Sequence, residues 1–161
     1  MKFYIKDEQG GGYCPATPKD IIKEGRNYAS SLLCRGKKFV GSSVEAKEAI
    51  AGKFQAQERE IFGCLFLDNK NRILAWIELF LGTINATTVY PREVVKESLR
   101  LNAASVVFAH NHPSGDSSPS SQDIDLTHRL QEILKVVDVK VLDHLVVGDT
   151  ITSLSDMGLM K

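Results

Sequence analysis

The sequence predicts an α/β fold, a three-layer-like sandwich in which a central mixed β-sheet is flanked by helices. Amphipathic helical stretches alternate along the chain with short extended apolar runs. Two of these runs flank a short polar turn, as the strands of a hairpin do. Hydrophobic residues make up 43% of the 161 residues, which is enough for one core. Interleaved helices and strands of this kind pack in layers.

The first 42 residues predict an arm with one helix, which precedes a domain over residues 43–161. The arm opens with a short alternating run, and the triple glycine at residues 10–12 is a flexible break. A threonine cap, a proline and an aspartate at residues 17–20 mark a helix start, and an apolar stripe follows to Leu33. The triple glycine lacks the Lys-Ser/Thr of a phosphate loop, so we predict no chemistry in this arm.

Each predicted element of the domain begins at a local signal and continues with a regular apolar spacing. Ser42 and Ser43 cap the first helix, and Pro91 starts another. We find no internal repeat. In chain order we expect a helix over 43–57, strands over 61–67 and 73–80 joined as a hairpin, a helix from 91, a strand over 104–109, a helix from 120, a strand over 139–147 and a short edge strand over 151–154.

The charge of the chain argues against a general electrostatic affinity for nucleic acid, because 20 basic side chains balance 20 acidic ones. A local basic patch stays open, since Arg92, Lys96 and Arg100 recur on one face of a predicted helix. A charged, solvated helix face is the favoured interpretation of these three residues. DNA therefore stays open as a partner, without support from the net charge.

The sequence predicts a cytoplasmic protein that does not associate with membranes. Its N-terminus lacks the apolar run of a signal peptide, and no stretch approaches the length of a membrane span. Cys14, Cys34 and Cys64 are odd in number and widely spaced. We expect them to be reduced thiols, with no cysteine among metal ligands.

The end of the strand over 104–109 and the helix from 120 carry the residues of a predicted metal site. Side chains two apart on a strand point to the same face, so His110 and His112 can aim at one point. A helix start at Ser120 can return Asp123 toward them. Two histidines and an aspartate make a three-ligand set for zinc, with a fourth position open for water.

A simpler interpretation of the same residues has to be weighed. Ser120 and Asp123 fit a capping box, in which each side chain bonds the backbone of the other residue. His110 and His112 would then be two satisfied polar residues at a strand end. This interpretation does not explain why both patterns surround one loop, so we favour the metal site.

A zinc-bound water attacks best when a carboxylate outside the ligand set takes its proton. Asp116 is a plain turn residue in the simpler interpretation, Asp125 points away on its helix, and Glu78 lies on a solvent face. Glu60 begins a strand at the edge of the core. The residues by themselves favour Glu60 only weakly over Glu58, which the simpler interpretation places at a solvated helix end.

The ordered motif His110-x-His112-x7-Ser120-x2-Asp123 resembles the signature of the JAMM (MPN+) metalloproteases. The surrounding sequence, over about residues 43–161, resembles the RadC family of bacterial JAB-domain proteins. The matching words are His110-Asn111-His112-Pro113-Ser114-Gly115, Gly82-Thr83, Pro91-Arg92-Glu93-Val94 and Leu142-Asp143-His144. The resemblance implies a JAB/MPN fold, layered like that of the cytidine deaminases. The chain is no deaminase itself, because its three cysteines cannot supply the Pro-Cys-x-x-Cys of that class.

The resemblance also implies roles for single residues. His110, His112 and Asp123 would hold one Zn²⁺ per chain, and Ser120 would donate a hydrogen bond to the developing oxyanion. Glu60 would be the general base, because the JAMM pattern has a glycine three residues after its glutamate, as Gly63 is here. The implied function is a zinc-dependent hydrolase that cleaves a peptide or isopeptide bond of an unknown protein or peptide, by a zinc-bound water that the glutamate activates.

Two departures from the JAMM pattern bear on this function. Asn111 stands where many JAMM peptidases have serine or threonine, although RadC proteins share it; its side chain should point to the other face and leave the metal geometry unchanged. Full-length RadC proteins carry a helix-hairpin-helix region upstream. The first 42 residues here are too short for this region and lack its Gly-hydrophobic-Gly turns, so the chain resembles the short forms found on prophages and mobile elements.

The alternative function is a DNA-associated RadC-like protein, for DNA repair or a mobile element, that acts as a nuclease or as a non-catalytic interaction module. No second acidic cluster supports a two-metal nuclease. The pair Asp143-His144 is open in a similar way. It either supports a ligand histidine from behind or is a satisfied polar pair in the core.

Overall fold

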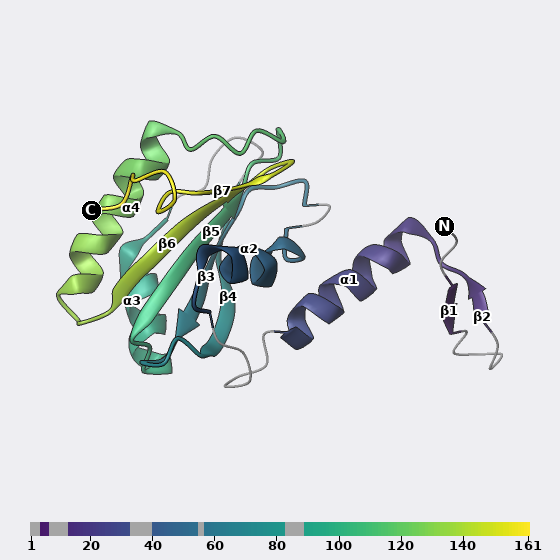
Figure 1. Cartoon of the computed structure of the whole chain (residues 1–161), viewed down its shortest axis with the longest axis horizontal. Coiled ribbons are helices and arrows are strands. Elements are labelled where there is room, and N and C mark those ends of the chain that lie inside the picture. The colour runs from purple at the N-terminus through teal and green to yellow at the C-terminus, as the bar shows by residue number, and fades with distance from the viewer. Residues whose placement is uncertain (1–3, 7–12, 33–39, 55–56, 83–88) are drawn as a thin grey trace.

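The computed structural model of the chain describes residues 4–6, 13–32, 40–54, 57–82 and 89–161 (Figure 1). It confirms the predicted α/β class and the mixed sheet. The elements are β1 (Tyr4–Lys6), β2 (Tyr13–Pro15), α1 (Pro18–Leu32), α2 (Ser43–Ala51), β3 (Ile61–Leu67), β4 (Ile73–Leu81), α3 (Pro91–Leu101), β5 (Ser105–Asn111), α4 (Ser121–Lys135), β6 (Lys140–Val147) and β7 (Ile151–Ser153).

Five strands form the central sheet in the order β4-β3-β5-β6-β7. β3 pairs antiparallel with β4 and with β5, while β5 and β6 are parallel and β7 is antiparallel to β6. A parallel pair needs a crossover connection, and α4 supplies the one between β5 and β6. The first turn of α4 therefore follows closely on the C-terminal end of β5.

Helices cover both faces of the sheet (Figure 1). Ile50 of α2 belongs to one buried cluster with Val107, and Leu130 of α4 belongs to another with Phe108 on the opposite face. Successive residues of a strand alternate between faces, so His110 shares the face of Phe108. This alternation directs the histidine toward the helices α3 and α4 rather than toward α2.

The first helix of the domain ends earlier than the sequence pattern predicts. α2 stops at Ala51 instead of near residue 57, and Gly52 caps it by donating its backbone N–H to the carbonyl of Ile50. Glycine favours helix ends over helix interiors, which explains the early stop. Phe54, which the helical spacing had grouped with α2, still reaches the core from the following turn and is 6% exposed.

Gly63 of β3 is needed for the packing of the β3–β4 hairpin. A β-carbon at this position would lie 2.3 Å from the indole ring of Trp76, which occupies that space. Gly63, the glycine that aligns Glu60 with the JAMM pattern, is thus also explained by the packing of Trp76 against it. The triple glycine of the arm and the residues Leu33, Cys34 and Thr83, with residues 55 and 56, lie outside the described residues.

The arm contains the predicted helix and an antiparallel hairpin of β1 and β2. Asp20 confirms the predicted helix start, because its carboxylate accepts a hydrogen bond of 2.9 Å from the backbone N–H of Thr17. α1 approaches the domain at α2, and the hairpin lies at the far end of α1 (Figure 1). Among the described residues, no helix is long and apolar enough to cross a membrane.

Candidate metal centre

The three predicted ligands meet where β5 ends and α4 begins. The Nε2 atoms of His110 and His112 are 2.9 Å apart. Asp123 approaches them from α4, with Oδ1 3.2 Å from Nε2 of His110 and Oδ2 3.7 Å from Nε2 of His112. The structure thus brings together three side chains that belong to a strand end and a helix start, and that can hold a metal ion.

The capping box predicted as the simpler interpretation is present at the same place. Oδ2 of Asp123 accepts hydrogen bonds from the backbone N–H and the hydroxyl of Ser120, at 2.7 and 2.6 Å. The backbone N–H of Asp123 donates to the Ser120 hydroxyl oxygen at 3.1 Å. Oδ1 faces His110 instead. One carboxylate therefore caps the helix and completes the cluster, so the two interpretations are compatible.

Asp123 is an anion in this setting. Burial opposes its ionisation, but the neighbouring His110 and the two hydrogen bonds from Ser120 hold its pKa well below the usual range for aspartate. A deprotonated carboxylate is the form that coordinates a metal. The side chain thus carries the charge that balances a bound cation.

His112 turns a lone pair toward the cluster. Its Nδ1 lies 2.7 Å from the backbone carbonyl oxygen of Asp116. A carbonyl oxygen only accepts, so Nδ1 carries the hydrogen and Nε2 is free to bind a metal. Asp116 itself is the turn residue that the simpler interpretation expects: its carboxylate accepts from the backbone N–H of Ser118, which lowers the pKa of Asp116.

His110 is supported from behind by a residue that the sequence left undecided. Its Nδ1 lies 2.9 Å from Nε2 of His144, a fully buried side chain of β6. Burial, together with the nearby His110, holds the pKa of His144 well below that of a free imidazole. Nδ1 of His144 lies 2.6 Å from the hydroxyl of Thr127 on α4. His144 therefore contacts a predicted ligand, as the supporting role requires.

Asp143 points away from this cluster. Its carboxylate accepts hydrogen bonds from the hydroxyl of Ser153 at 2.7 Å and from the backbone N–H of Ser155 at 3.1 Å. Burial raises the pKa of Asp143 in spite of these bonds. The pair splits between the two roles considered: Asp143 is a satisfied core residue, and His144 is a neighbour of the candidate metal centre.

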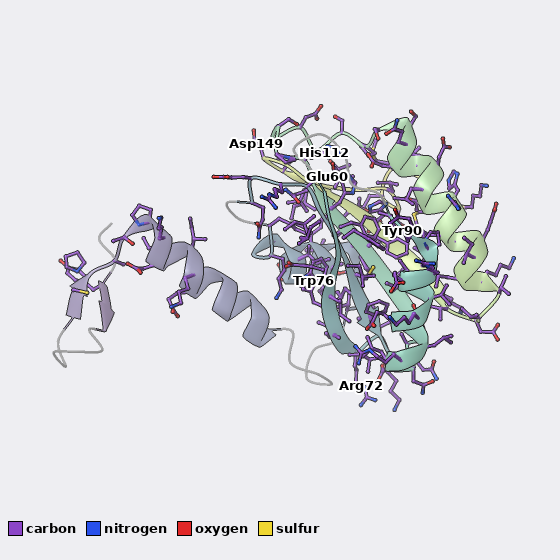
Figure 2. All side chains as sticks on the ribbon, turned by 180° about the vertical axis from the view of Figure 1, so that it is seen from behind. Glu60, Arg72, Trp76, Tyr90, His112 and Asp149 are labelled. Atoms are coloured by element: carbon purple, nitrogen blue, oxygen red, sulfur yellow. The ribbon has the colours of Figure 1, made fainter. Side chains whose placement is uncertain are left out.

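Glu60 lies at the same end of the sheet as the histidines. Phe62 of β3 pairs with His110 of β5, so continuing the antiparallel register by two residues sets Glu60 opposite His112. Figure 2 shows the two labelled side chains at one edge of the molecule. Glu60 is half-buried, whereas Glu58 is exposed. Glu78 is exposed on β4, where the indole N–H of Trp76 contacts it at 3.4 Å.

Asn111 holds the backbone around Glu60. Its Oδ1 accepts a hydrogen bond of 2.8 Å from the N–H of Ile61, and its Nδ2 donates one of 3.0 Å to the carbonyl of Arg59. The side chain points to the other face of the sheet, as predicted. Sequence reasoning missed this contact, since only the pairing of β3 with β5 brings these residues together.

The donor set fits a zinc ion in spacing as well as in chemistry. Ligand atoms at about 2.0–2.1 Å from a tetrahedral zinc lie about 3.3 Å from one another. The three observed separations, 2.9, 3.2 and 3.7 Å, lie around that value. Imidazole nitrogens with a carboxylate oxygen are ligands that zinc and similar divalent metals accept.

Comparison with known proteins supports the same grouping. A family model for the RadC-like JAB domain matches residues 40–159. A UPF0758 protein of Vibrio cholerae is 56% identical over 139 residues, which are 86% of this chain and 88% of that protein. A UPF0758 protein of Thioalkalivibrio sulfidiphilus is 44% identical over 140 residues, 87% of this chain but 62% of its own length.

A third relative, a UPF0758 protein of Cellvibrio japonicus, is 55% identical over 124 residues, which are 74% of this chain and 55% of that protein. The chain thus spans 88% of the Vibrio relative but only 62% and 55% of the two longer relatives. The match of the family model covers most of the sequence and includes every residue of the cluster. The chain therefore belongs to the RadC-like JAB domain family, of the JAMM-type superfamily.

Proposed function

We propose that this protein is a zinc-dependent hydrolase of JAMM type that cleaves a peptide or isopeptide bond. The observation that carries the proposal is the convergence of His110, His112 and Asp123. His112 has its Nδ1 hydrogen committed to a carbonyl, and Asp123 is held ionised, so both present lone pairs to the same point. Lone pairs that face one another over about 3 Å repel unless a cation lies between them.

When bound, a zinc ion would act as a Lewis acid and make water acidic enough to be deprotonated near neutral pH. Glu60 would take the proton from the attacking water on a carboxylate oxygen and pass it to the nitrogen of the leaving amine. Glu60 directly precedes β3 and lies across from His112, a position that suits a general base. Asn111 would keep that edge in position through the backbone of residues 59 and 61.

Ser120 would stabilise the oxygen of the substrate carbonyl as negative charge develops on it. In the present structure the Ser120 hydroxyl donates to Oδ2 of Asp123 at 2.6 Å. The hydroxyl would have to turn from Asp123 to the substrate, while the backbone N–H of Ser120 continues to hold Oδ2. The cap of α4 and the oxyanion donor would thus be the same side chain in two orientations.

Metal content and hydrolysis test the proposal together. Protein purified without a histidine tag should contain about one zinc per chain by elemental analysis, and His112→Ala should lose it. Asp123→Asn should lose it as well, whereas Asp125→Asn, an exposed neighbour on α4, should keep it. Wild-type protein without zinc after reconstitution would contradict the proposal and favour a non-catalytic interaction module.

The general base is tested by a pair of matched variants. Glu60→Gln should keep its zinc and hydrolyse peptide or isopeptide substrates at least about a hundredfold more slowly, because a general base contributes about that much or more. Glu58→Gln removes an equal charge two residues earlier from an exposed position and should leave the rate unchanged. The opposite result for the pair would show that Glu58 is the base.

The basic residues of α3 do not favour the DNA-associated alternative. Arg92 and Lys96 lie 3.5 and 3.4 Å from Glu93, and Arg100 lies 2.7 Å from Glu97. Each of the three cations is therefore beside a carboxylate of its own helix. This arrangement is typical of a charged, solvated helix face, which is the interpretation that the sequence favours.

A further inference from the structure

A chain of buried hydrogen bonds runs behind the candidate metal centre and returns to the helix that carries Asp123. It passes from Nδ1 of His110 to Nε2 of His144 at 2.9 Å, and from Nδ1 of His144 to the hydroxyl of Thr127 at 2.6 Å. The Thr127 hydroxyl contacts the backbone carbonyl of Asp123 at 2.6 Å. His110, Thr127 and His144 are all at most 1% exposed.

The backbone carbonyl of Asp123 determines which atom is the donor in every hydrogen bond of this series. A carbonyl oxygen only accepts, so the single hydroxyl hydrogen of Thr127 is donated to it. The Thr127 oxygen must then accept from His144, which places the hydrogen of that imidazole on Nδ1. A neutral imidazole has one N–H, so Nε2 of His144 accepts from Nδ1 of His110. The remaining nitrogen of His110, Nε2, is left with its lone pair toward His112 and Asp123.

We propose that Thr127 and His144 are positioning residues that fix the tautomer of His110 and so present its Nε2 lone pair to the metal. This inference rests on the proposed function, since it assigns a task to two residues that do not touch the metal. The task is specific because the other tautomer is incompatible with binding. A hydrogen on Nε2 of His144 would reverse its bond with His110 and put the His110 hydrogen on Nε2, where the metal has to bind.

The chain of hydrogen bonds also joins the two secondary-structure elements of the site. His110 lies on β5, while Thr127 and Asp123 lie one helical turn apart on α4. Because the last acceptor is the carbonyl of Asp123, the same three groups that orient His110 also connect it to the backbone of the third ligand. A change at Thr127 should therefore weaken metal binding without removing any ligand.

Zinc affinity, measured by competition with a chromophoric chelator, tests the inference. Thr127→Val keeps the shape of the side chain but removes the acceptor for His144, and we expect it to bind zinc about ten- to a hundredfold more weakly. Thr127→Ser restores a hydroxyl and should recover most of the affinity. The matched control is Ser98→Ala, which removes a similar buried hydroxyl that donates to a backbone carbonyl on α3, and it should bind zinc like the wild type.

Nitrogen-15 NMR of the imidazole rings gives a second readout that needs no metal. In the metal-free protein His144 should carry its hydrogen on Nδ1, whereas His128, whose Nε2 lies 2.9 Å from the carbonyl of Leu159, should carry it on Nε2. Thr127→Val should change the His144 signal and leave that of His128 as it is. A hydrogen on Nε2 of His144 in the wild type would overturn the inference.

The two proposals fail in different ways. Wild-type protein that binds zinc while Thr127→Val binds it equally well would overturn the role of Thr127 and His144 and leave the proposed hydrolase standing. Wild-type protein that binds no zinc would overturn both. Weakened binding in Thr127→Val with recovery in Thr127→Ser, together with the expected His144 tautomer, would support the inference.

Discussion

Ser120 and Asp123 show at the scale of single residues how one pair of side chains can carry two tasks. Their reciprocal bonds cap α4 through Oδ2 of Asp123, while Oδ1 of the same carboxylate faces His110. A capping box holds Asp123 in one orientation before any metal arrives. The cap thus reduces the conformational freedom that a metal ligand would otherwise lose on binding.

The two tasks of Ser120 can be separated by a matched substitution. Ser120→Ala and Ser42→Ala each remove a serine N-cap, of α4 and of α2. Each should lower the free energy of unfolding of the metal-free protein by about 1 kcal/mol, measured in urea. Only Ser120→Ala should also slow hydrolysis, because Ser42 lies at a different helix. Unchanged hydrolysis in Ser120→Ala would mean that Ser120 serves only as a cap.

At the scale of elements, the pairing of β3 with β5 decides where the predicted base lies. Glu60 precedes β3, and its carbonyl accepts a hydrogen bond of 2.8 Å from the N–H of Gly82 just after β4. Asn111, at the end of β5, bonds the residues on either side of it. The position of Glu60 is therefore set by three strand ends.

Asn111→Ser tests this arrangement with the residue type found at the same place in many JAMM peptidases. The shorter side chain should break at least one of the two hydrogen bonds made by the buried Asn111 side chain and lower the free energy of unfolding by about 1–3 kcal/mol. Zinc content should stay the same, since Asn111 points away from the ligands, while hydrolysis should slow as Glu60 loses its support. Asn69→Ser, at an exposed turn position, is the control and should change neither property.

A drop in zinc content in Asn111→Ser would contradict this prediction, because it would place the side chain among the supports of the metal rather than those of the base. Unchanged unfolding in urea would show that the two bonds contribute nothing to stability. The measurement therefore separates the edge of β3 from the ligand cluster.

At the scale of the whole molecule, the arm and the domain differ in their relation to the site. The ligands, the predicted base and their supports all lie between residues 58 and 144, and the matched family model begins at residue 40. Val40 is 5% exposed, and its N–H donates to the carbonyl of Asn71 at 2.9 Å. Among the residues whose burial the structure describes, Val40 is the first buried one, and it lies just ahead of the predicted boundary at residue 43.

A chain that starts at residue 40 should therefore fold and bind zinc as tightly as the whole protein, as measured by urea unfolding and chelator competition. A shorter chain that starts at residue 53 should lose cooperative unfolding, because it lacks Ile50, which is fully buried in the core. Loss of folding in the first truncation would show that the arm belongs to the domain and that the division at residues 42 and 43 is wrong.

Local signals were sufficient to predict the fold class, most elements and the cluster of possible ligands. Helix caps, hydrophobic period and the spacing of two histidines on a strand are encoded within a few residues, so they can be read without knowledge of contacts. The sequence did not predict the end of α2 at Gly52, because Phe54 continues the apolar spacing beyond it. The apolar spacing indicates that Phe54 is buried, but it does not show whether Phe54 lies in a helix or in a turn, because either can place a side chain in the core.

The sequence left the supporting role of His144 open, and only the tertiary structure decided it and added Thr127 and Asn111. Thr127 and His144 are 17 residues apart, and Asn111 lies 50 residues from the N–H that it binds. Such contacts depend on the parallel pairing of β5 with β6 and the antiparallel pairing of β3 with β5. A sequence pattern reports which residues can coordinate a metal, but strand register decides which neighbours fix their orientation and their hydrogens.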